Sequence, residues 1–337
     1  MPFSSVVGHR PVLELLARAV ARQMLPQSLI FAGPAGIGKR RTALALAQAL
    51  NCDSPIAIAA SATVAAGMDA CGACVPCTRI ARGVHADILV VEPGDSGTIK
   101  VDQVREAIDR AMYRPFEGRR RIVTIEDADA LLAEAQNALL KTLEEPPPAS
   151  VFVLITSRPD LLLPTVRSRC QRLRFGPLHP ADVAAVLVRD HGFDAADARA
   201  AAAASDGSVG RALTDGAADA LEDRDAAAQL LGAAATPDPR RRLDAAKAFA
   251  GSAADRDELS RRLRAVSSLL RDLGLIAVRG AEHILANADV RPQLQSLARA
   301  YDARRAVEAF AVVDRAVDAL DRNASPKIVA DWVALHL

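Results

Sequence analysis

A glycine-rich segment is the first part of the sequence whose residue types and spacing could perform chemistry. Residues 33–39 read G-P-A-G-I-G-K, after a short apolar run and before a helical pattern. This is the context of a phosphate-binding loop, in which backbone N–H groups and a helix N-terminus attract phosphate oxygens. Gly33 opens the loop, Gly36 and Gly38 permit its tight turn, and Lys39 reaches the β- and γ-phosphates. We therefore predict a nucleotide loop, against the alternative of an accidental glycine-rich turn.

The residue after the lysine departs from the pattern of a hydrolysing loop. Such a loop places Ser or Thr there, because the hydroxyl oxygen ligates Mg²⁺. Arg40 stands at this position, and a guanidinium has only donors and no lone pair for a metal. Thr42 cannot substitute, because two further residues turn it about 200° round the helix. We therefore expect ATP to be bound weakly or to remain unhydrolysed.

An acidic pair follows a run that predicts a buried strand at residues 121–125. The pair reads Glu126 then Asp127, whereas a hydrolysing site uses Asp for the metal and then Glu for water. Both side chains differ from that order by one methylene, at positions where catalysis is sensitive to about 1 Å. This second departure also predicts poor hydrolysis. The alternative interpretation is an acidic pair that only caps the following helix.

A cysteine cluster is the second constellation. Cys71, Cys74 and Cys77 follow one another at intervals of three residues, and Cys52 lies upstream at the end of the helix after the loop. Four thiolates suit tetrahedral Zn²⁺ and leave no open coordination position, so the site would be structural. The alternative is a cluster of redox-active or adventitious thiols. We predict a zinc module over residues 52–77.

An arginine in the segment T-V-R-S-R-C, residues 165–170, is the third candidate. It follows a predicted strand and a proline-bounded turn. An arginine displayed on the rim of a sheet can reach a phosphate bound by a neighbouring subunit, as an arginine finger does. Arg169 would be a solvated surface side chain if it stood alone, but the loop and the acidic strand end upstream favour the finger.

Alternating strands and helices must position these residues. We predict strands at residues 28–32, 88–91, 121–125 and 151–156, and helices at residues 12–24, 39–50, 101–112 and 130–145. The 101–112 helix should bury Val101, Val104, Ile108 and Met112 on one face. This alternation predicts an α/β fold with a mostly parallel sheet that is covered on both faces. After Phe175 only helical periodicity remains, and residues 232–239 contain Gly and Pro breaks. We therefore predict three domains, at residues 1–175, 176–235 and 236–337.

Length and composition exclude several classes of protein. A chain of 337 residues is too long for one ordinary core, and its 42 Lys and Arg balance 41 Asp and Glu, so bulk charge names no partner. The uncharged stretch between Asp53 and Asp69 is too short and too weakly apolar to span a bilayer. Residues 1–10 lack the apolar core of a signal sequence. We expect a cytoplasmic protein with reduced cysteines and no membrane partner.

Taken together, the motifs resemble bacterial clamp-loader subunits, which are AAA+ proteins of the DNA polymerase III holoenzyme. The resemblance is carried by V-V-G-H at 6–9, the loop at 33–39, the cysteines, E-D-A-D at 126–129, N-A-L-L-K-T-L-E-E-P-P at 137–147 and S-R-C at 168–170. It is specific over residues 1–175. It implies a P-loop AAA+ domain with a zinc-binding insertion, followed by a helical lid domain and a helical collar domain that mediates oligomerisation.

The resemblance also implies residue roles. Val6, Val7 and Gly8 would line an adenine pocket, and Thr156 stands where the family keeps a sensor at the end of a strand. Arg169 would be donated in trans to the ATP site of an adjacent gamma/tau subunit. The implied partners are the other clamp-loader subunits (gamma/tau and delta), the sliding clamp, and primer–template DNA through the assembled ring.

Three functions remain open from the sequence. The first is a clamp-loader subunit that does not hydrolyse ATP, which Arg40 and the order of the acidic pair favour. The second is a gamma/tau-like or other AAA+ motor that hydrolyses ATP itself, which Lys39 favours. The third is a zinc module that binds nucleic acid directly, against which the near-neutral charge and the scarcity of stacking aromatic residues speak. For DNA contacts in a ring, Arg105 and Arg110 are candidates, with a solvated helix face as the alternative.

Overall fold

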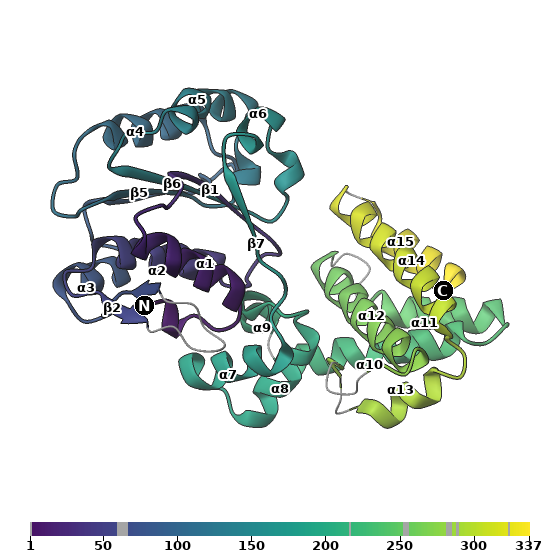
Figure 1. The fold of residues 1–337 in the computed structure, drawn as a ribbon. Coiled ribbons are helices and arrows are strands. Elements are labelled where there is room, and N and C mark those ends of the chain that lie inside the picture. The colour runs from purple at the N-terminus through teal and green to yellow at the C-terminus, as the bar shows by residue number, and fades with distance from the viewer. Residues whose placement is uncertain are drawn as a thin grey trace. The chain divides into compact units, whose positions relative to one another are not determined.

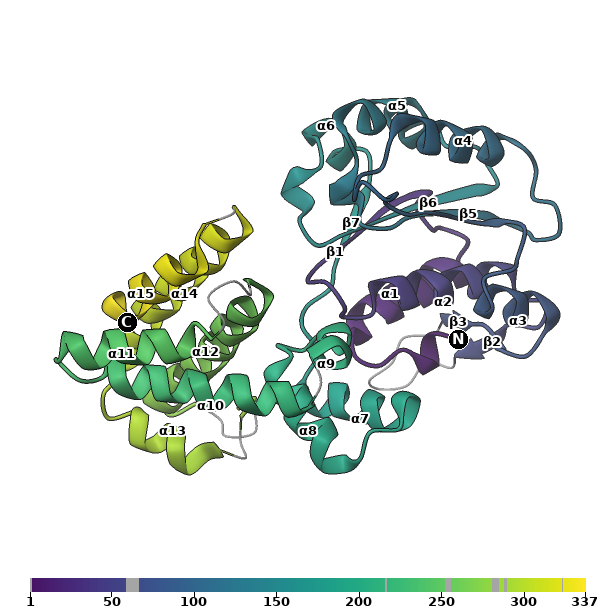
Figure 2. The ribbon, with the colours of Figure 1, turned by 180° about the vertical axis from the view of Figure 1, so that it is seen from behind.

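The computed structural model describes residues 2–58, 67–215, 217–251, 256–280, 285–287, 290–322 and 324–337. The chain forms two compact units, Met1–Leu178 and His179–Leu337. The first unit holds every candidate functional residue named above, and Figures 1 and 2 show it from opposite sides. All the regular elements described in the second unit are helices.

A parallel sheet of five strands forms the centre of the first unit, in the order β4-β5-β6-β1-β7. The strands are β1 (Ser28–Ala32), β4 (Ile88–Val91), β5 (Arg121–Ile125), β6 (Ser150–Thr156) and β7 (Gln171–Arg174). Every residue of β1, β5 and β6 is buried. Such continuous burial is typical of parallel strands whose two faces are both covered, so the predicted α/β sheet is confirmed.

Helices cover both faces of this sheet (Figure 1). On one face, α1 (Arg10–Ala21) and α2 (Lys39–Asn51) share a core with Phe31 of β1. On the other face, α4 (Val101–Met112) and α5 (Ala133–Glu144) share a core with Ile30 and with Leu154 of β6. Short helices complete the unit: η1 (Phe3–Ser5), α3 (Val75–Ala81), η2 (Ala128–Ala130), η3 (Pro159–Leu161) and α6 (Pro164–Arg167).

A small hairpin joins the N-terminal segment to the cysteine region. It consists of β2 (Ile56–Ile58) and β3 (Gly67–Asp69), which pair antiparallel. The Asp69 carboxylate accepts hydrogen bonds from the backbone N–H groups of Phe3, at 2.7 Å, and Ser4, at 3.0 Å. A Cβ on Gly67 would lie 2.9 Å from that of Ala17, so α1 packs directly against β3. The sequence predicted neither this hairpin nor its attachment.

The structure differs from the sequence predictions in two places. β7 was not predicted, because only Leu173 of its four residues is buried and the other three are polar and exposed, as suits an edge strand. Met112 is 58% exposed, although the helical pattern placed it on the buried face of α4. The buried face of α4 instead consists of Val104, Ala107 and Ala111. Their spacing of three and four residues places all three side chains on the face that packs against the sheet.

From residue 227 onward, the helices of the second unit pack around a separate apolar core. Its centre includes Tyr301, whose buried hydroxyl donates a hydrogen bond to the carbonyl of Leu231 at 3.1 Å. The division of this region into a lid and a collar stays a prediction. Its helices are α7 (Pro180–His191), α8 (Ala195–Ala204), α9 (Val209–Asp215), α10 (Ala217–Ala234), α11 (Pro239–Phe249), α12 (Arg256–Ala277), α13 (Arg291–Leu297), α14 (Ala303–Asp321) and α15 (Pro326–His336). Among the helices described in the two units, none is both long and apolar enough to cross a membrane.

A buried ion pair fixes the connection between α4 and β5. The carboxylate of Asp87 is fully buried and lies 2.7 Å from a guanidinium nitrogen of Arg121. It also accepts hydrogen bonds from the backbone N–H groups of Phe116, Glu117 and Gly118 at 2.7 to 2.9 Å. Burial alone would raise the pKa of Asp87, but the three N–H groups and Arg121 outweigh it and lower the pKa to about 2.

Replacing Asp87 with Ala should therefore destabilise the first unit strongly. Arg121 would remain buried without a charged partner, and breaking a buried pair costs about 3 to 5 kcal/mol. Because the folded-state pKa lies below the unfolded value of about 3.9, the carboxylate stabilises the fold above about pH 4, and this stabilisation is lost as the pH falls towards about 2. Urea unfolding followed by circular dichroism measures the loss.

The matched control is the exposed Asp109 on α4, whose replacement by Ala should change the free energy of unfolding by about 0.5 kcal/mol or less. The difference between the wild type and Asp87→Ala should shrink between about pH 4 and about pH 2. An equal loss at neutral and acidic pH would show that the carboxylate charge does not stabilise this connection.

Candidate functional site

The predicted phosphate-binding loop lies between β1 and α2, at the carboxyl edge of the sheet. Gly36 and Gly38 have φ angles of +72° and +100°, which side chains rarely adopt, so glycine is required at both positions. The N–H of Gly33 donates to the carbonyl of Thr156 at 3.2 Å, which joins the loop to the end of β6. His9 Nε2 lies 2.7 Å from the carbonyl oxygen of Ile37. The strand–loop–helix context of the prediction is therefore present.

Lys39 is folded back onto the loop. Its side chain is buried, and Nζ donates hydrogen bonds to the carbonyls of Gly33 at 2.6 Å and Pro34 at 2.5 Å. Burial lowers the pKa of Lys39, and the negative charges of Asp127 and Asp129 oppose that shift. The ammonium group thus lies between the loop and the acidic strand end, where it can reach a bound phosphate only by leaving these carbonyls.

Arg40 connects the carboxyl ends of two neighbouring strands. Its Nε lies 3.0 Å from Oε1 of Glu126, which follows β5, and one of its terminal nitrogens lies 3.2 Å from Oε1 of Glu92, which follows β4. Burial raises the pKa of Glu126 to about 7, against the opposing effect of Arg40. Sequence reasoning missed Glu92, although an acidic residue directly after a strand beside β5 was the available signal.

The residues at this position do not fit the magnesium ion of a hydrolysing site. A guanidinium stands where a ligand hydroxyl would be, and it already pairs with Glu126. Thr42 is fully buried, and its hydroxyl donates to the carbonyl of Gly38 at 3.1 Å inside the helix. Asp127 lies in a left-handed turn, with φ of +45°, and its side chain makes no capping hydrogen bond to η2. The capping interpretation of the acidic pair thus lacks support.

Thr156, the predicted sensor at the end of β6, contacts an acidic residue that follows the neighbouring strand β5. Its fully buried hydroxyl donates to Oδ1 of Asp129 at 2.6 Å, and the N–H of Ser157 donates to the same oxygen at 3.1 Å. Arg158 lies 3.6 Å from Oδ2. Burial would raise the pKa of Asp129, but these contacts lower it on balance. Asp129 therefore stays charged and faces Lys39, a role that sequence reasoning did not assign.

Of the three residues that the sequence assigns to an adenine pocket, two line the same cavity. Val6 and Gly8 line a cavity of about 520 Å³ between the N-terminal segment, α1 and the β2–β3 hairpin. Val7 does not line it, and neither does any residue of the loop at 33–39. Gly8 has a φ of +73°, and a Cβ there would lie 2.3 Å from Leu178, so the close approach requires glycine.

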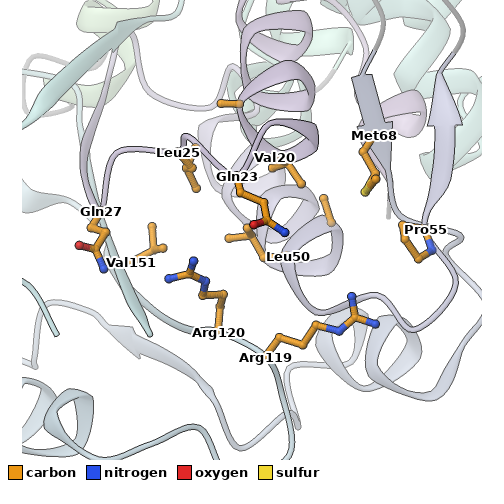
Figure 3. Close-up of a pocket in the computed structure, with 12 residues that line it drawn as sticks. Val20, Gln23, Leu25, Gln27, Leu50, Pro55, Met68, Arg119, Arg120 and Val151 are labelled. Carbon is orange, nitrogen blue, oxygen red and sulfur yellow. The ribbon is translucent and has the colours of Figure 1, made fainter. Parts of the chain in front are cut away.

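A second cavity, of about 250 Å³, lies at the opposite end of the strands (Figure 3). Gln27 precedes β1, Arg120 precedes β5 and Val151 is near the start of β6, and all three line it. The loop and the acidic pair follow the carboxyl ends of these strands. This cavity is therefore separate from the candidate nucleotide site.

The four predicted cysteines do meet in one cluster. Their sulfur atoms all lie within 4.8 Å of one another, and those of Cys52 and Cys74 are 3.8 Å apart. Four sulfurs at about 2.3 Å from a tetrahedral ion would be about 3.8 Å apart, so the cluster can hold a metal ion. Backbone N–H groups lower the pKa of Cys71 to about 6, whereas burial raises the pKa of Cys77. The end of α2 and the start of α3 position these ligands.

Arg169 lies between α6 and β7 and is partly exposed. Its Nε and one terminal nitrogen each lie 2.9 Å from Oε2 of Glu144 at the end of α5, and its other terminal nitrogen donates to the carbonyl of Thr165 at 3.1 Å. The side chain is therefore held against the surface of its own unit rather than free in solvent. Glu144 belongs to the motif at 137–147, but no role for it was predicted.

The Thr156 contact supplies a direct test of how the strand end is held. Thr156→Val keeps the shape of the side chain but removes the hydrogen bond to Asp129, and such bonds to charged groups contribute about 1.5 to 3 kcal/mol. We expect the free energy of unfolding to fall by about that amount in a urea titration. Thr156→Ser keeps the hydroxyl and should recover most of it. Equal losses in the two variants would mean that packing, not the hydrogen bond, stabilises this position.

Known proteins of DNA polymerase III match this chain in part. The delta′ subunit of Pseudomonas aeruginosa is 44% identical over 139 residues, which cover 41% of this chain and 39% of that protein. The delta′ subunit of Bacillus subtilis is 36% identical over 169 residues, 50% of this chain and 48% of that protein. The gamma/tau subunit of Mycobacterium tuberculosis is 35% identical over 188 residues, 56% of this chain and 31% of that protein. The chain thus spans less than half the length of each relative.

A family model covers most of the first unit. It is described as DNA polymerase III, delta subunit, and it matches residues 8–179, just over half of the chain. The loop, the acidic strand end, the cysteine cluster and Arg169 all lie within the matched residues. The match confirms the resemblance to clamp-loader AAA+ subunits that the motifs indicate. The chain belongs to the DNA polymerase III, delta subunit, family.

Proposed function

We propose that this chain is the delta prime subunit of the DNA polymerase III clamp loader and that it does not hydrolyse ATP itself. In this role it is a rigid stator that donates Arg169 to the ATP site of a neighbouring gamma/tau subunit. The observation that carries the proposal is the pairing of Arg40 with Glu126, at 3.0 Å, where a hydrolysing loop would hold magnesium. The delta′ relatives support the choice of subunit.

The trans role follows from what an arginine finger needs. A finger stabilises the charge of the transferring phosphoryl group and raises the rate by about 10³ to 10⁵ at the site that receives it. Its own subunit has to supply only a firmly held guanidinium on an accessible surface. Arg169 is 32% exposed and is oriented by Glu144 and the carbonyl of Thr165. These contacts support a guanidinium that is already oriented before a neighbouring subunit binds.

The proposed partners follow from this role. They are the gamma/tau and delta subunits, the sliding clamp, and primer–template DNA that enters the assembled ring in the cytoplasm. DNA would be held through phosphate contacts without base readout. Arg105 and Arg110 on the exposed face of α4 are candidates for such contacts, and Arg105 also lies 3.5 Å from Asp102.

We propose zinc as the ion of the cysteine cluster, because four thiolates in a closed tetrahedral set are typical of structural zinc. The ion would join the end of α2, through Cys52, to α3, through Cys77. It would supply folding energy to a segment that the apolar core holds only in part. No step of the ATP chemistry would depend on it.

A gamma/tau-like motor is the second candidate. Lys39 is present in the loop, and the gamma/tau relative matches a longer stretch of this chain than either delta′ relative does. This candidate requires the chain to hydrolyse ATP with its own site. It therefore differs from the first in the turnover of the isolated chain.

Arg169→Ala in a reconstituted clamp loader tests the finger. In a loader in which only the ATP site beside this chain is intact, we expect clamp- and DNA-stimulated turnover to fall by about 10²-fold or more. Arg167→Ala is the control, because Arg167 ends the short helix α6 two residues before Arg169 and pairs with Asp160 at 3.0 Å. Unchanged turnover and clamp loading by the Arg169 variant would rule out the finger.

Metal analysis of the purified chain tests the zinc proposal. We expect about one zinc per wild-type chain and much less in Cys74→Ser, with a lower melting temperature, because three ligands leave the tetrahedral set incomplete. Cys170→Ser replaces the fifth cysteine, which lies outside the cluster, and should keep its zinc. Zinc-free wild-type protein after expression in zinc-supplemented medium would contradict the proposal.

A further inference from the structure

The carboxyl edge of the sheet carries a cation of its own beside the nucleotide loop. Arg40 is in the first turn of α2, directly after Lys39. Its guanidinium pairs with Glu126 at 3.0 Å and Glu92 at 3.2 Å, at the ends of the adjacent strands β5 and β4. These contacts hold a positive charge where the acidic end of β5 would otherwise attract a metal ion.

The guanidinium can still contact a ligand while it makes these pairs. Its side chain is 61% exposed, and an arginine has five N–H donors, of which the two ion pairs use only part. The planar fork of an arginine suits phosphate oxygens, to which it can donate two parallel hydrogen bonds. Arg40 therefore offers both the charge and the directional contacts that a nucleotide phosphate needs.

A metal ion would have to compete with this guanidinium for Glu126. A divalent ion beside Arg40 would be repelled by the positive charge of the guanidinium. The carboxylates of Glu126 and Glu92 are therefore already paired with a cation, whereas a metal-free phosphate gains a donor from Arg40.

We propose that Arg40 is a built-in replacement for the metal ion, and that the loop binds adenine nucleotides without Mg²⁺. The inference rests on the nucleotide loop of the proposed function but not on the arginine finger. Lys39 would leave the carbonyls of Gly33 and Pro34 to contact the phosphates, and Arg40 would contact them from the side of β5. The fraction of loops that hold a nucleotide would then not depend on the concentration of Mg²⁺.

Titration calorimetry of the full chain with ADP and with ATP, each in excess Mg²⁺ and in excess EDTA, tests this inference. We expect the dissociation constant of the wild type to change by about twofold or less between the two conditions. In Arg40→Thr, a hydroxyl replaces the guanidinium and Glu126 becomes free, so Mg²⁺ should tighten binding by about tenfold or more. Arg41→Thr makes the same change one residue further along α2 and should bind like the wild type. Lys39→Ala should lose binding, which places the nucleotide in the loop.

Three results would overturn the inference. They are wild-type binding that Mg²⁺ tightens by about tenfold, no wild-type binding under either condition, or Mg²⁺-independent binding by Arg40→Thr. Circular dichroism and melting temperature show whether each variant is folded, and Arg41→Thr controls for changes in helix stability. Each of these results leaves the finger proposal standing, because that proposal is measured as turnover at a site on another subunit.

Discussion

The pairing of the Arg40 guanidinium with the Glu126 carboxylate is the interaction on which the functional interpretation depends. It joins the first turn of α2 to the end of β5 at 3.0 Å, and Glu92 extends it to β4. The loop glycines and Lys39 keep the backbone and the charge that attract phosphates. The metal-binding half of the site instead carries an internal ion pair. A loop that keeps its phosphate-binding residues but has an ion pair at the metal position suits nucleotide binding better than nucleotide hydrolysis.

One sheet positions both parts of the proposed machinery. The order β5-β6-β1 places the ends of three neighbouring strands side by side, so Glu126, Thr156 and Gly33 lie at one edge of the sheet although the sequence separates them widely. Hydrogen bonds from Thr156 to Asp129 and from Gly33 to Thr156 tie these ends together. Arg169 comes just before β7, the strand beside β1. The same sheet therefore holds both the nucleotide loop and Arg169, the proposed finger.

The sequence predicted the buried strands well because each is a continuous apolar run. The bounds of β1, β4 and β5 are the predicted ones, and β6 begins one residue earlier. It could not predict β7, since Leu173 is its single buried residue. It also missed Glu92, Glu144 and Asp129, because their roles arise from contacts across the fold: Glu144 is 25 residues from Arg169, and Asp129 is 27 residues from Thr156. Motifs identify the residues that could do chemistry, but the sheet order decides which of them meet.

ATP turnover by the purified chain, alone and with Mg²⁺, tests the central claim most directly. An internal ion pair in place of the metal ligand predicts no turnover above that of Lys39→Ala, even when the nucleotide is bound. Steady hydrolysis by the wild type that Lys39→Ala abolishes would contradict the account and would favour a motor of the gamma/tau kind.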